Sequence, residues 1–318
     1  MEWIKLGKIF DPGDHSAALG GGEFAKSPQA LILADCIRIY FCTQTRSANG
    51  KYISRSYFVD FDKALKKTLA VAAQPVVSLG RLGEFDEHGI FPFNVLAYEG
   101  RVLAYTSGWS RRSAVSIEMS IGLAISEDGG VSFVKHGAGG PIMTIAQNEP
   151  CLVGDAFVQH LNGTFHMWYI FGDRWVRPTS GAAPERYYRI AHATSDDGVN
   201  WQRDGMPIVE AASANECQAL PTVVFRDGRY HMYFCFRDAF DFRTNKSNAY
   251  RLGYAYSDDL QKWHRDDSRG GIEPTDGAWD SDMLCYPNVF TCDDTVYMLY
   301  NGNEFGRHGF GLAKLVTT

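Results

Sequence analysis

The sequence has no long apolar run and no concentration of basic residues, and both absences limit what the protein can be. No stretch approaches the roughly 18 apolar residues of a membrane-spanning helix, and the first ten residues lack the features of a signal peptide. A net charge of −6 without any Lys/Arg run argues against a nucleic-acid partner. We therefore expect a cytoplasmic protein with no membrane span and no bound nucleic acid.

Cysteine is scarce and irregularly spaced. The seven cysteines form an odd set with no C-x-x-C pair, so neither a disulfide framework nor a zinc site is indicated. Most of them lie in apolar, strand-like patterns, where a buried free thiol is the expected state. The sequence predicts neither a metal nor a cofactor.

A repeat of about 64 residues organises the whole chain. A pair of strand-like segments joined by a turn recurs five times, and the aromatic share of 14% also favours strands. Aligned on one position near the start of each pair, the copies are spaced by 64, 64, 65 and 66 residues. These anchor positions are Pro28, Pro92, Ala156, Pro221 and Pro287. The pattern predicts an all-β fold, a five-bladed β-propeller forming one domain over residues 1–318.

The N-terminal segment matches a strand that the last repeat lacks. In earlier copies a third strand ends in a turn such as Ser195-Asp-Asp-Gly, which we interpret as structural, and an aromatic residue then opens a fourth strand. Trp3 matches these aromatic residues, Trp201 and Trp263. We therefore predict that the N-terminal strand closes the last blade and satisfies its edge hydrogen bonds.

Acidic residues recur just before the first strand of each blade, where a propeller brings equivalent positions around one central pocket. Five residues before the anchors stand Glu23, Glu87, Cys151, Glu216 and Asp282, with Asp86, Glu149, Asp155 and Asp280 close by. Of these acids, Glu23, Glu149 and Asp155 are candidates for binding a substrate. Neighbouring carboxylates can push their pKa values apart, as glycosidic bond chemistry requires. The alternative is structural, in which the acids cap turns or pair with arginines.

The ends of the second strands, on the same face, carry groups suited to binding a sugar. An indole can stack on a sugar ring, while Arg and Asn side chains donate to hydroxyls or to the carboxylate of an acidic sugar. In the alternative interpretation the arginines neutralise the acids as buried pairs. The candidates are Arg46, Trp109, Arg174, Arg237 and Asn301.

The Ser-x-Asp-Gly-x-x-Trp turns and three further segments carry a family resemblance. The segments are Phe85-Asp-Glu-His-Gly-Ile-Phe-Pro, Glu216-Cys217 and Trp279-Asp-Ser-Asp-Met-Leu-Cys-Tyr-Pro. With five blades, they resemble the glycoside hydrolase superfamily of families 32, 43, 68 and 130. The likeness looks closest to family 43-like proteins found among bacterial surface-polysaccharide biosynthesis genes.

That resemblance implies a base or nucleophile Asp, a pKa-modulating Asp and an acid Glu, each from a different blade. Carried over, the candidates are Asp86 or Glu87, Glu216 and Asp282. The first blade departs from the family 43 pattern, because the usual Asp is absent and Glu23 stands near its place.

Our first hypothesis is a glycosidase-like enzyme acting on a bacterial oligosaccharide or sugar conjugate, with Glu216 as acid and Asp86 or Asp282 as base. A second is a glycoside phosphorylase or transferase of the same fold, in which Arg46, Arg174 and Arg237 would bind phosphate. A third is a sugar-binding propeller without catalysis. The sequence leaves all three open.

Overall fold

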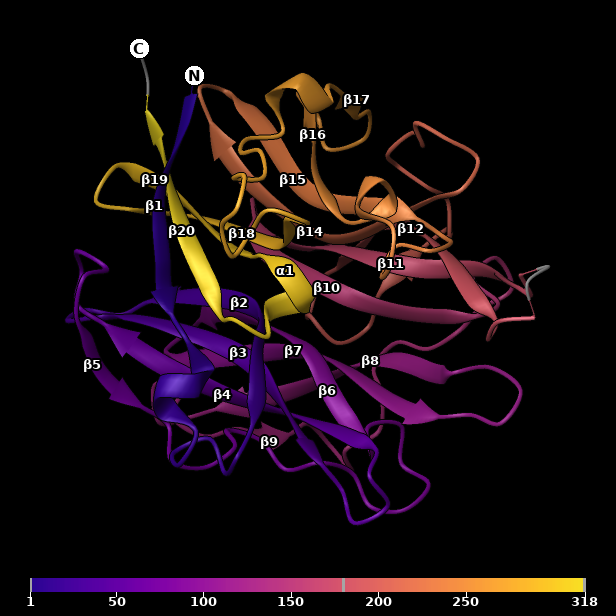
Figure 1. Cartoon of the computed structure of the whole chain (residues 1–318), viewed down its shortest axis with the longest axis horizontal. Helices are drawn as coiled ribbons and strands as arrows, with labels where there is room; N and C mark the ends of the chain where they lie inside the picture. The colour runs from indigo at the N-terminus through magenta and orange to yellow at the C-terminus, as the bar shows by residue number, and fades with distance from the viewer. Residues whose placement is uncertain (1, 179–180, 317–318) are drawn as a thin grey trace.

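The computed structural model describes residues 2–178 and 181–316, which fold almost entirely into β-sheet (Figure 1). This part of the chain contains twenty strands, one short α-helix, α1 (Asn303–Gly306), and three 3-10 turns. No helix within it is long and apolar enough to cross a membrane. The predicted all-β class is confirmed. The 3-10 turns are η1 (Pro12–His15), η2 (Lys246–Asn248) and η3 (Asp267–Arg269).

The strands form antiparallel groups of four, which we call units. The units are numbered one to five in the order in which their first strands, β2, β6, β10, β14 and β18, follow one another in the chain. Units one and two share an eight-stranded sheet through a single parallel pairing of Ser54 with Gly89. Unit one contains β2 (Glu23–Ile32), β3 (Ile37–Arg46), β4 (Tyr52–Phe61) and β5 (Thr68–Val71). Unit two contains β6 (Gly89–Tyr98), β7 (Arg101–Arg111), β8 (Ile117–Ser126) and β9 (Val134–Lys135).

Units three to five are separate four-stranded sheets. Unit three contains β10 (Leu152–Leu161), β11 (Thr164–Val176), β12 (Glu185–Ser195) and β13 (Gln202–Arg203). Unit four contains β14 (Glu216–Arg226), β15 (Arg229–Asp238), β16 (Arg251–Ser257) and β17 (His264–Arg265). Unit five contains β18 (Cys285–Cys292), β19 (Thr295–Asn301), β20 (Phe310–Val316) and the N-terminal β1 (Glu2–Phe10).

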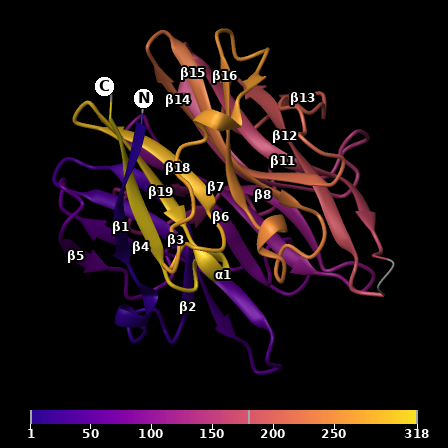
Figure 2. The same cartoon turned by 45° about the horizontal axis from the view of Figure 1, so that its top comes forward.

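The two ends of the chain meet in unit five. β1 pairs antiparallel with β20, and Trp3 lies opposite Leu315. Figures 1 and 2 both show the indigo N-terminal strand beside the yellow C-terminal one. The predicted pairing of the N-terminal segment with the last repeat is confirmed.

The Ser-Asp turns fasten neighbouring units together. In the turn of unit three, the Ser195 hydroxyl accepts from the Gly198 amide at 2.9 Å, and the Asp197 carboxylate accepts from Val199 and Asn200. The hydroxyl of Tyr105 in unit two then donates to the Gly198 carbonyl at 3.1 Å. The structural interpretation of these turns is confirmed.

The first strands pack side by side in cyclic order, from β2 through β6, β10, β14 and β18 and back to β2. Side-chain amides tie them at the axis. The Asn288 carbonyl oxygen accepts from the Ala30 amide at 2.9 Å, and the Gln29 side-chain oxygen accepts from Asn94 and Asn288. The bond to Ala30 satisfies a main-chain amide, and the two bonds to Gln29 link the side chains of neighbouring first strands.

Candidate functional site

A cavity of about 300 Å³ lies among the strands of all five units. Among the described residues, its wall combines aromatic rings, four cationic side chains and one carboxylate. A cavity that combines aromatic side chains with convergent polar groups is typical of a small-molecule site. The residues that carry its chemistry are Lys26, Phe91, Trp109, Asp155, Arg186, Tyr188, Arg237, Phe242, Arg243, Tyr250, Tyr286 and Phe305.

Bulges in the first strands direct side chains into this cavity. Each first strand breaks its pairing register at the anchor position of the repeat and the residue before it. The residue that precedes the anchor has φ of 52° at Ser27, 52° at Asp155, 47° at Leu220 and 58° at Tyr286. Such values are uncommon outside glycine, and they concentrate at binding sites. Of the five equivalent positions, Phe91, Asp155 and Tyr286 line the cavity.

Asp155 is the carboxylate of the cavity wall, and its side chain is buried. One oxygen accepts from the Leu220 amide at 3.3 Å. Burial raises the pKa of Asp155 to about 7, although the Leu220 amide and the charge of Arg186 oppose the rise. The group therefore holds a proton up to near-neutral pH, as a general acid requires.

Aromatic rings form much of the remaining wall. Phe91 and Tyr286 meet edge to face with centroids 5.4 Å apart, and the hydroxyls of Tyr188 and Tyr250 are hydrogen-bonded at 2.7 Å. Trp109 also lines the cavity. Flat rings with polar edges suit the faces and hydroxyls of a sugar.

Lys26 is the cation on the first strand of unit one. Its ammonium donates to the Gln44 side-chain oxygen at 3.0 Å and lies 4.3 Å from the centre of the Phe24 ring. Burial lowers its pKa to about 8. The amine therefore stays mostly charged at neutral pH but loses its proton more readily than a solvent-exposed lysine.

The acids that precede the first strands mostly serve a repeated structural ion pair. In four units a buried acid meets a cation from the outermost strand of the same unit, and this cation lies two residues after the aromatic that opens the strand. The pairs are Asp86–Lys135 at 2.6 Å, Glu149–Arg203 at 2.8 Å, Glu216–Arg265 at 2.6 Å and Asp280–Lys5 at 2.5 Å.

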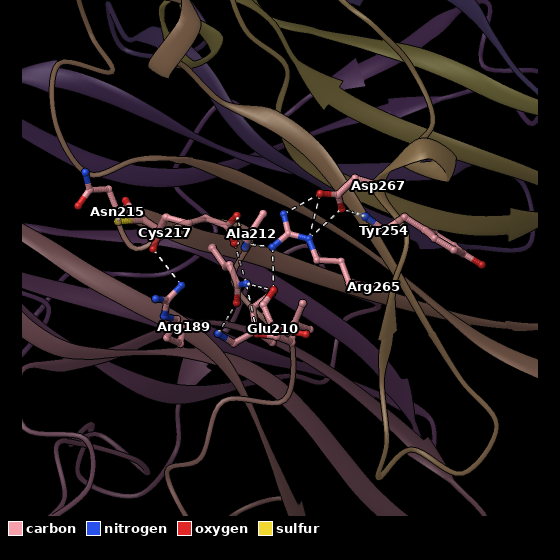
Figure 3. A network of polar contacts seen from close by, with 12 residues as sticks. Arg189, Glu210, Ala212, Asn215, Cys217, Tyr254, Arg265 and Asp267 are labelled. Atoms are coloured by element: carbon pink, nitrogen blue, oxygen red, sulfur yellow. Dashed lines mark hydrogen bonds and ion pairs between the residues drawn. The ribbon is translucent and has the colours of Figure 1, made fainter.

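The pair in unit four shows how firmly such an acid is held. Figure 3 shows Arg265 between Asp267 on one side and the chain around Glu210 on the other. Its guanidinium reaches Glu216 at 2.6 Å and Asp267 at 2.7 Å. Glu216 also accepts from Gln218 at 2.9 Å, so its carboxylate is enclosed by donors.

The remaining predicted acids lie apart from the cavity wall. Glu87 pairs with the ring of His88 at 3.0 Å. Asp282 pairs with Lys246 at 2.5 Å, and that lysine holds the pKa of Asp282 below its ordinary value. Glu23 is solvent-exposed and pairs with Arg307 at 3.1 Å. The structure thus does not bring Asp86, Glu87, Glu216 and Asp282 together in this cavity.

The second-strand candidates divide between the cavity and the surface. Trp109 and Arg237 line the cavity. Arg46 donates to the Gly50 carbonyl within its own hairpin, and Arg174 pairs with Asp173 at the surface. Asn301 is buried and links unit five to unit one, because it donates to the Ala25 carbonyl and accepts from the Ser27 amide.

Several cavity residues were not among the predicted ones. Lys26, Tyr188, Tyr250 and Tyr286 are the main examples. A signal existed for Tyr286, because it stands one residue before an anchor, in register with Asp155. Within residues 2–178 and 181–316, no group of three or more His, Cys, Asp or Glu side chains is placed to hold a metal.

The fold of this chain is shared with several solved proteins. It is similar to a solved protein described as a glycoside hydrolase, at TM-score 0.75 and 18% identity, over 99% of this chain and 92% of that protein. A thermostable family-43 glycoside hydrolase gives TM-score 0.67 at 13% identity, over 92% and 90%. A GH43_1 enzyme from Xanthomonas citri complexed with xylotriose gives TM-score 0.62 at 12% identity, over 99% and 91%. The chain has the fold of the glycoside hydrolases that include family 43.

The sequence relatives narrow the relationship further. No family model matches the chain. Two proteins from strains of Mycobacterium tuberculosis, described as uncharacterized proteins MT1551 and Rv1502, are each 33% identical over 325 residues. The alignment covers 99% of this chain and 99% of each relative. The chain belongs to the family of these mycobacterial proteins.

Proposed function

We propose that the protein is a glycosidase-like enzyme that takes a glycoside into the cavity and protonates the departing oxygen with Asp155. The observation that carries the proposal is the buried carboxyl on an aromatic cavity wall, with a pKa raised to about 7. A general acid must carry a proton at the working pH and release it to the leaving group. Asp155 meets the first condition.

We also propose that the five units form a single closed five-bladed propeller spanning the whole chain. The packing of β18 against β2 supports closure, as do the bonds of Asn288 and Asn301 to unit one. The pairing of β1 with β20 supports it too, since it leaves unit five with four strands like the other units. A closed ring would bring the five bulges around one axis.

The nucleophile decides between hydrolysis and phosphorolysis. Hydrolysis by paired carboxylates needs a second acid roughly 5 to 9.5 Å from the first. Among the described residues, Asp155 alone contributes a carboxylate to the cavity wall, beside four cations. This favours phosphorolysis as a second candidate. An oxygen of inorganic phosphate would bond to the anomeric carbon, the glycosidic bond would break, and the proton of Asp155 would go to the leaving oxygen.

We propose a bacterial oligosaccharide or sugar conjugate as the substrate, handled in the cytoplasm. Support for a saccharide comes from the aromatic wall and from the solved protein of this fold that is complexed with xylotriose. Fractionation of the producing cells tests the location. Recovery of the protein outside the cytoplasmic fraction would contradict it.

A turnover assay with and without phosphate tests the activity. The wild type and an Asp155→Asn variant are incubated with a panel of aryl glycosides and oligosaccharides, and free sugar and sugar 1-phosphate are measured. We expect Asp155→Asn to lose at least 100-fold in turnover, since general acid catalysis contributes roughly 10²–10⁴. Sugar 1-phosphate formed only with phosphate identifies the phosphorylase.

Two further outcomes matter. Turnover that Asp155→Asn leaves unchanged would show that another group donates the proton. Binding of the same sugars without any turnover would instead indicate a non-catalytic sugar-binding propeller, and the absence of a second carboxylate in the described cavity wall favours that candidate.

A further inference from the structure

We infer that the cavity recognises a sugar that carries its own anionic group, a carboxylate or a phosphate, and that the guanidinium of Arg237 binds this group. The inference rests on the proposed function, because it names the substrate class of the same cavity. The structural support for it comes from comparing the partners of Arg237 with those of the other buried charged side chains.

Arg237 is a buried cation that has no acidic partner in the part of the chain that the structure describes. Its residue is 2% exposed, and it lines the cavity from β15. Its guanidinium donates to the Tyr188 hydroxyl at 3.0 Å and to the Asp238 and Ala239 carbonyls at 2.8 and 3.3 Å. It lies 3.6 Å from the centre of the Phe242 ring. Within the described chain it has no ion pair, and its acceptors are neutral groups.

Elsewhere the same chain pairs its buried charges. The acids Asp86, Glu149, Glu216 and Asp280 each face a lysine or arginine within 2.8 Å. Removing a guanidinium from water without a counter-charge is costly, and arginine cannot escape the cost by losing its proton. Of the two buried arginines among the described residues, Arg38 pairs with Asp60, whereas Arg237 has no acidic partner, and a ligand anion would complete it.

Two other cations strengthen the field at the cavity. Lys26 bonds to Gln44, and Arg186 bonds to Ser116 at 3.4 Å, but neither has a carboxylate partner among the described residues. Arg243 differs, because it pairs with Glu185. The cavity therefore concentrates positive charge in a protein of net charge −6. Neutral sugars need no such arrangement, whereas uronic acids and sugar phosphates do.

Calorimetric titration with matched probes tests the inference. The probes are glucose, glucuronate, glucose 6-phosphate, glucose 1-phosphate and inorganic phosphate, each titrated at low and high salt. We expect at least one anionic sugar to bind 10-fold or more tighter than glucose, with affinity falling as salt rises. We expect Arg237→Gln to abolish this preference, and Arg237→Lys to restore it only in part, because lysine lacks the planar fork.

Arg229→Gln is the matched control, since Arg229 lies on the same strand but pairs with Asp258 at the surface. It should bind as the wild type does. If Arg237→Gln does not fold, Lys26→Gln replaces it and should reduce the preference for the anion several-fold. Equal binding of glucose and every anionic sugar overturns the inference. Inorganic phosphate binding as tightly as the sugar phosphates also overturns it, because the anion would then be a co-substrate.

The two proposals fail separately. Turnover of neutral glycosides without any anion preference would leave the proposed function standing and remove the substrate class. Tight, Arg237-dependent binding of a uronate or sugar phosphate, with no turnover of its glycosides, would support the anionic ligand and contradict the proposed enzymatic activity.

Discussion

The buried carboxyl of Asp155 makes the stability of this protein depend on pH. Its pKa rises from the ordinary value of 3.8 to about 7 in the folded chain, because burial disfavours its charge. Between these values the folded state holds a proton that the unfolded state has released, so stability falls as pH rises from about 4 to 7. A shift of this size corresponds to a few kcal/mol, at about 1.4 kcal/mol per pH unit.

We therefore predict that Asp155→Asn is more stable than the wild type at pH 8 and no more stable near pH 4. Asparagine keeps an acceptor for the Leu220 amide and removes the buried charge. Thermal unfolding across this pH range measures the difference, which should reach several degrees at pH 8. Asp282→Asn is the control, since its pKa is shifted downward by Lys246. An equal gain at both pH values would show that burial does not raise the pKa of Asp155.

Asp155 was foreseen only in part. The sequence placed it among the binding candidates, while the catalytic candidates were Asp86, Glu87, Glu216 and Asp282, which stand five or six residues before the anchors. Which position reaches the cavity depends on the bulge at the anchor, where φ is positive at Asp155 and Tyr286. Backbone conformation of this kind is set by packing and leaves no clear mark in a single sequence.

At the scale of elements, the outermost strands depend on the repeated ion pair. β9, β13 and β17 each form only two paired positions with the strand beside them. A cation in each of them, Lys135, Arg203 or Arg265, meets the buried acid of the same unit. The pair thus anchors a strand that its own hydrogen bonds hold weakly. Pairing of acids with arginines was one of two interpretations that the sequence left open.

We predict that Arg265→Met destabilises the protein by about 3–5 kcal/mol, because Glu216 would remain buried without its partner. A second change, Glu216→Gln, should recover much of that loss, as chemical denaturation of the single and double variants will show. Arg229→Met, at an exposed pair, should cost less than about 1 kcal/mol. Glu216→Gln also distinguishes structure from chemistry. Retained turnover would show that Glu216 serves the ion pair. A loss of turnover without a loss of stability would show that Glu216 takes part in catalysis.

At the scale of the whole molecule, the chain depends on contacts between its two ends. The 64-residue period could be predicted because apolar strand patterns and turn residues occur within short segments of sequence. Trp3 identified the N-terminal segment as the strand that the last repeat lacks. The repeat predicted a central pocket, and Trp109, Asp155 and Arg237 were among its predicted residues, but the rest of the wall could not be predicted because it combines residues from five units that no local pattern connects. β1 contributes both its pairing with β20 and the Lys5 partner of buried Asp280.

Deleting residues 2–10 should therefore be more damaging than an ordinary terminal truncation. It would expose the edge of β20 and leave Asp280 buried without a cation, which together favour unfolding and edge-to-edge association. We expect the melting temperature to fall by about 10 °C or more, which scanning calorimetry measures, and soluble yield to drop.

A circular permutant provides the control. Glu2 pairs with Val316, so a short linker can join the ends while the chain opens in the exposed turn at Asn49–Gly50. That permutant keeps every strand and should unfold within a few degrees of the wild type. If the deletion variant also unfolds within a few degrees of the wild type, the N-terminal strand contributes little to the stability of the folded chain.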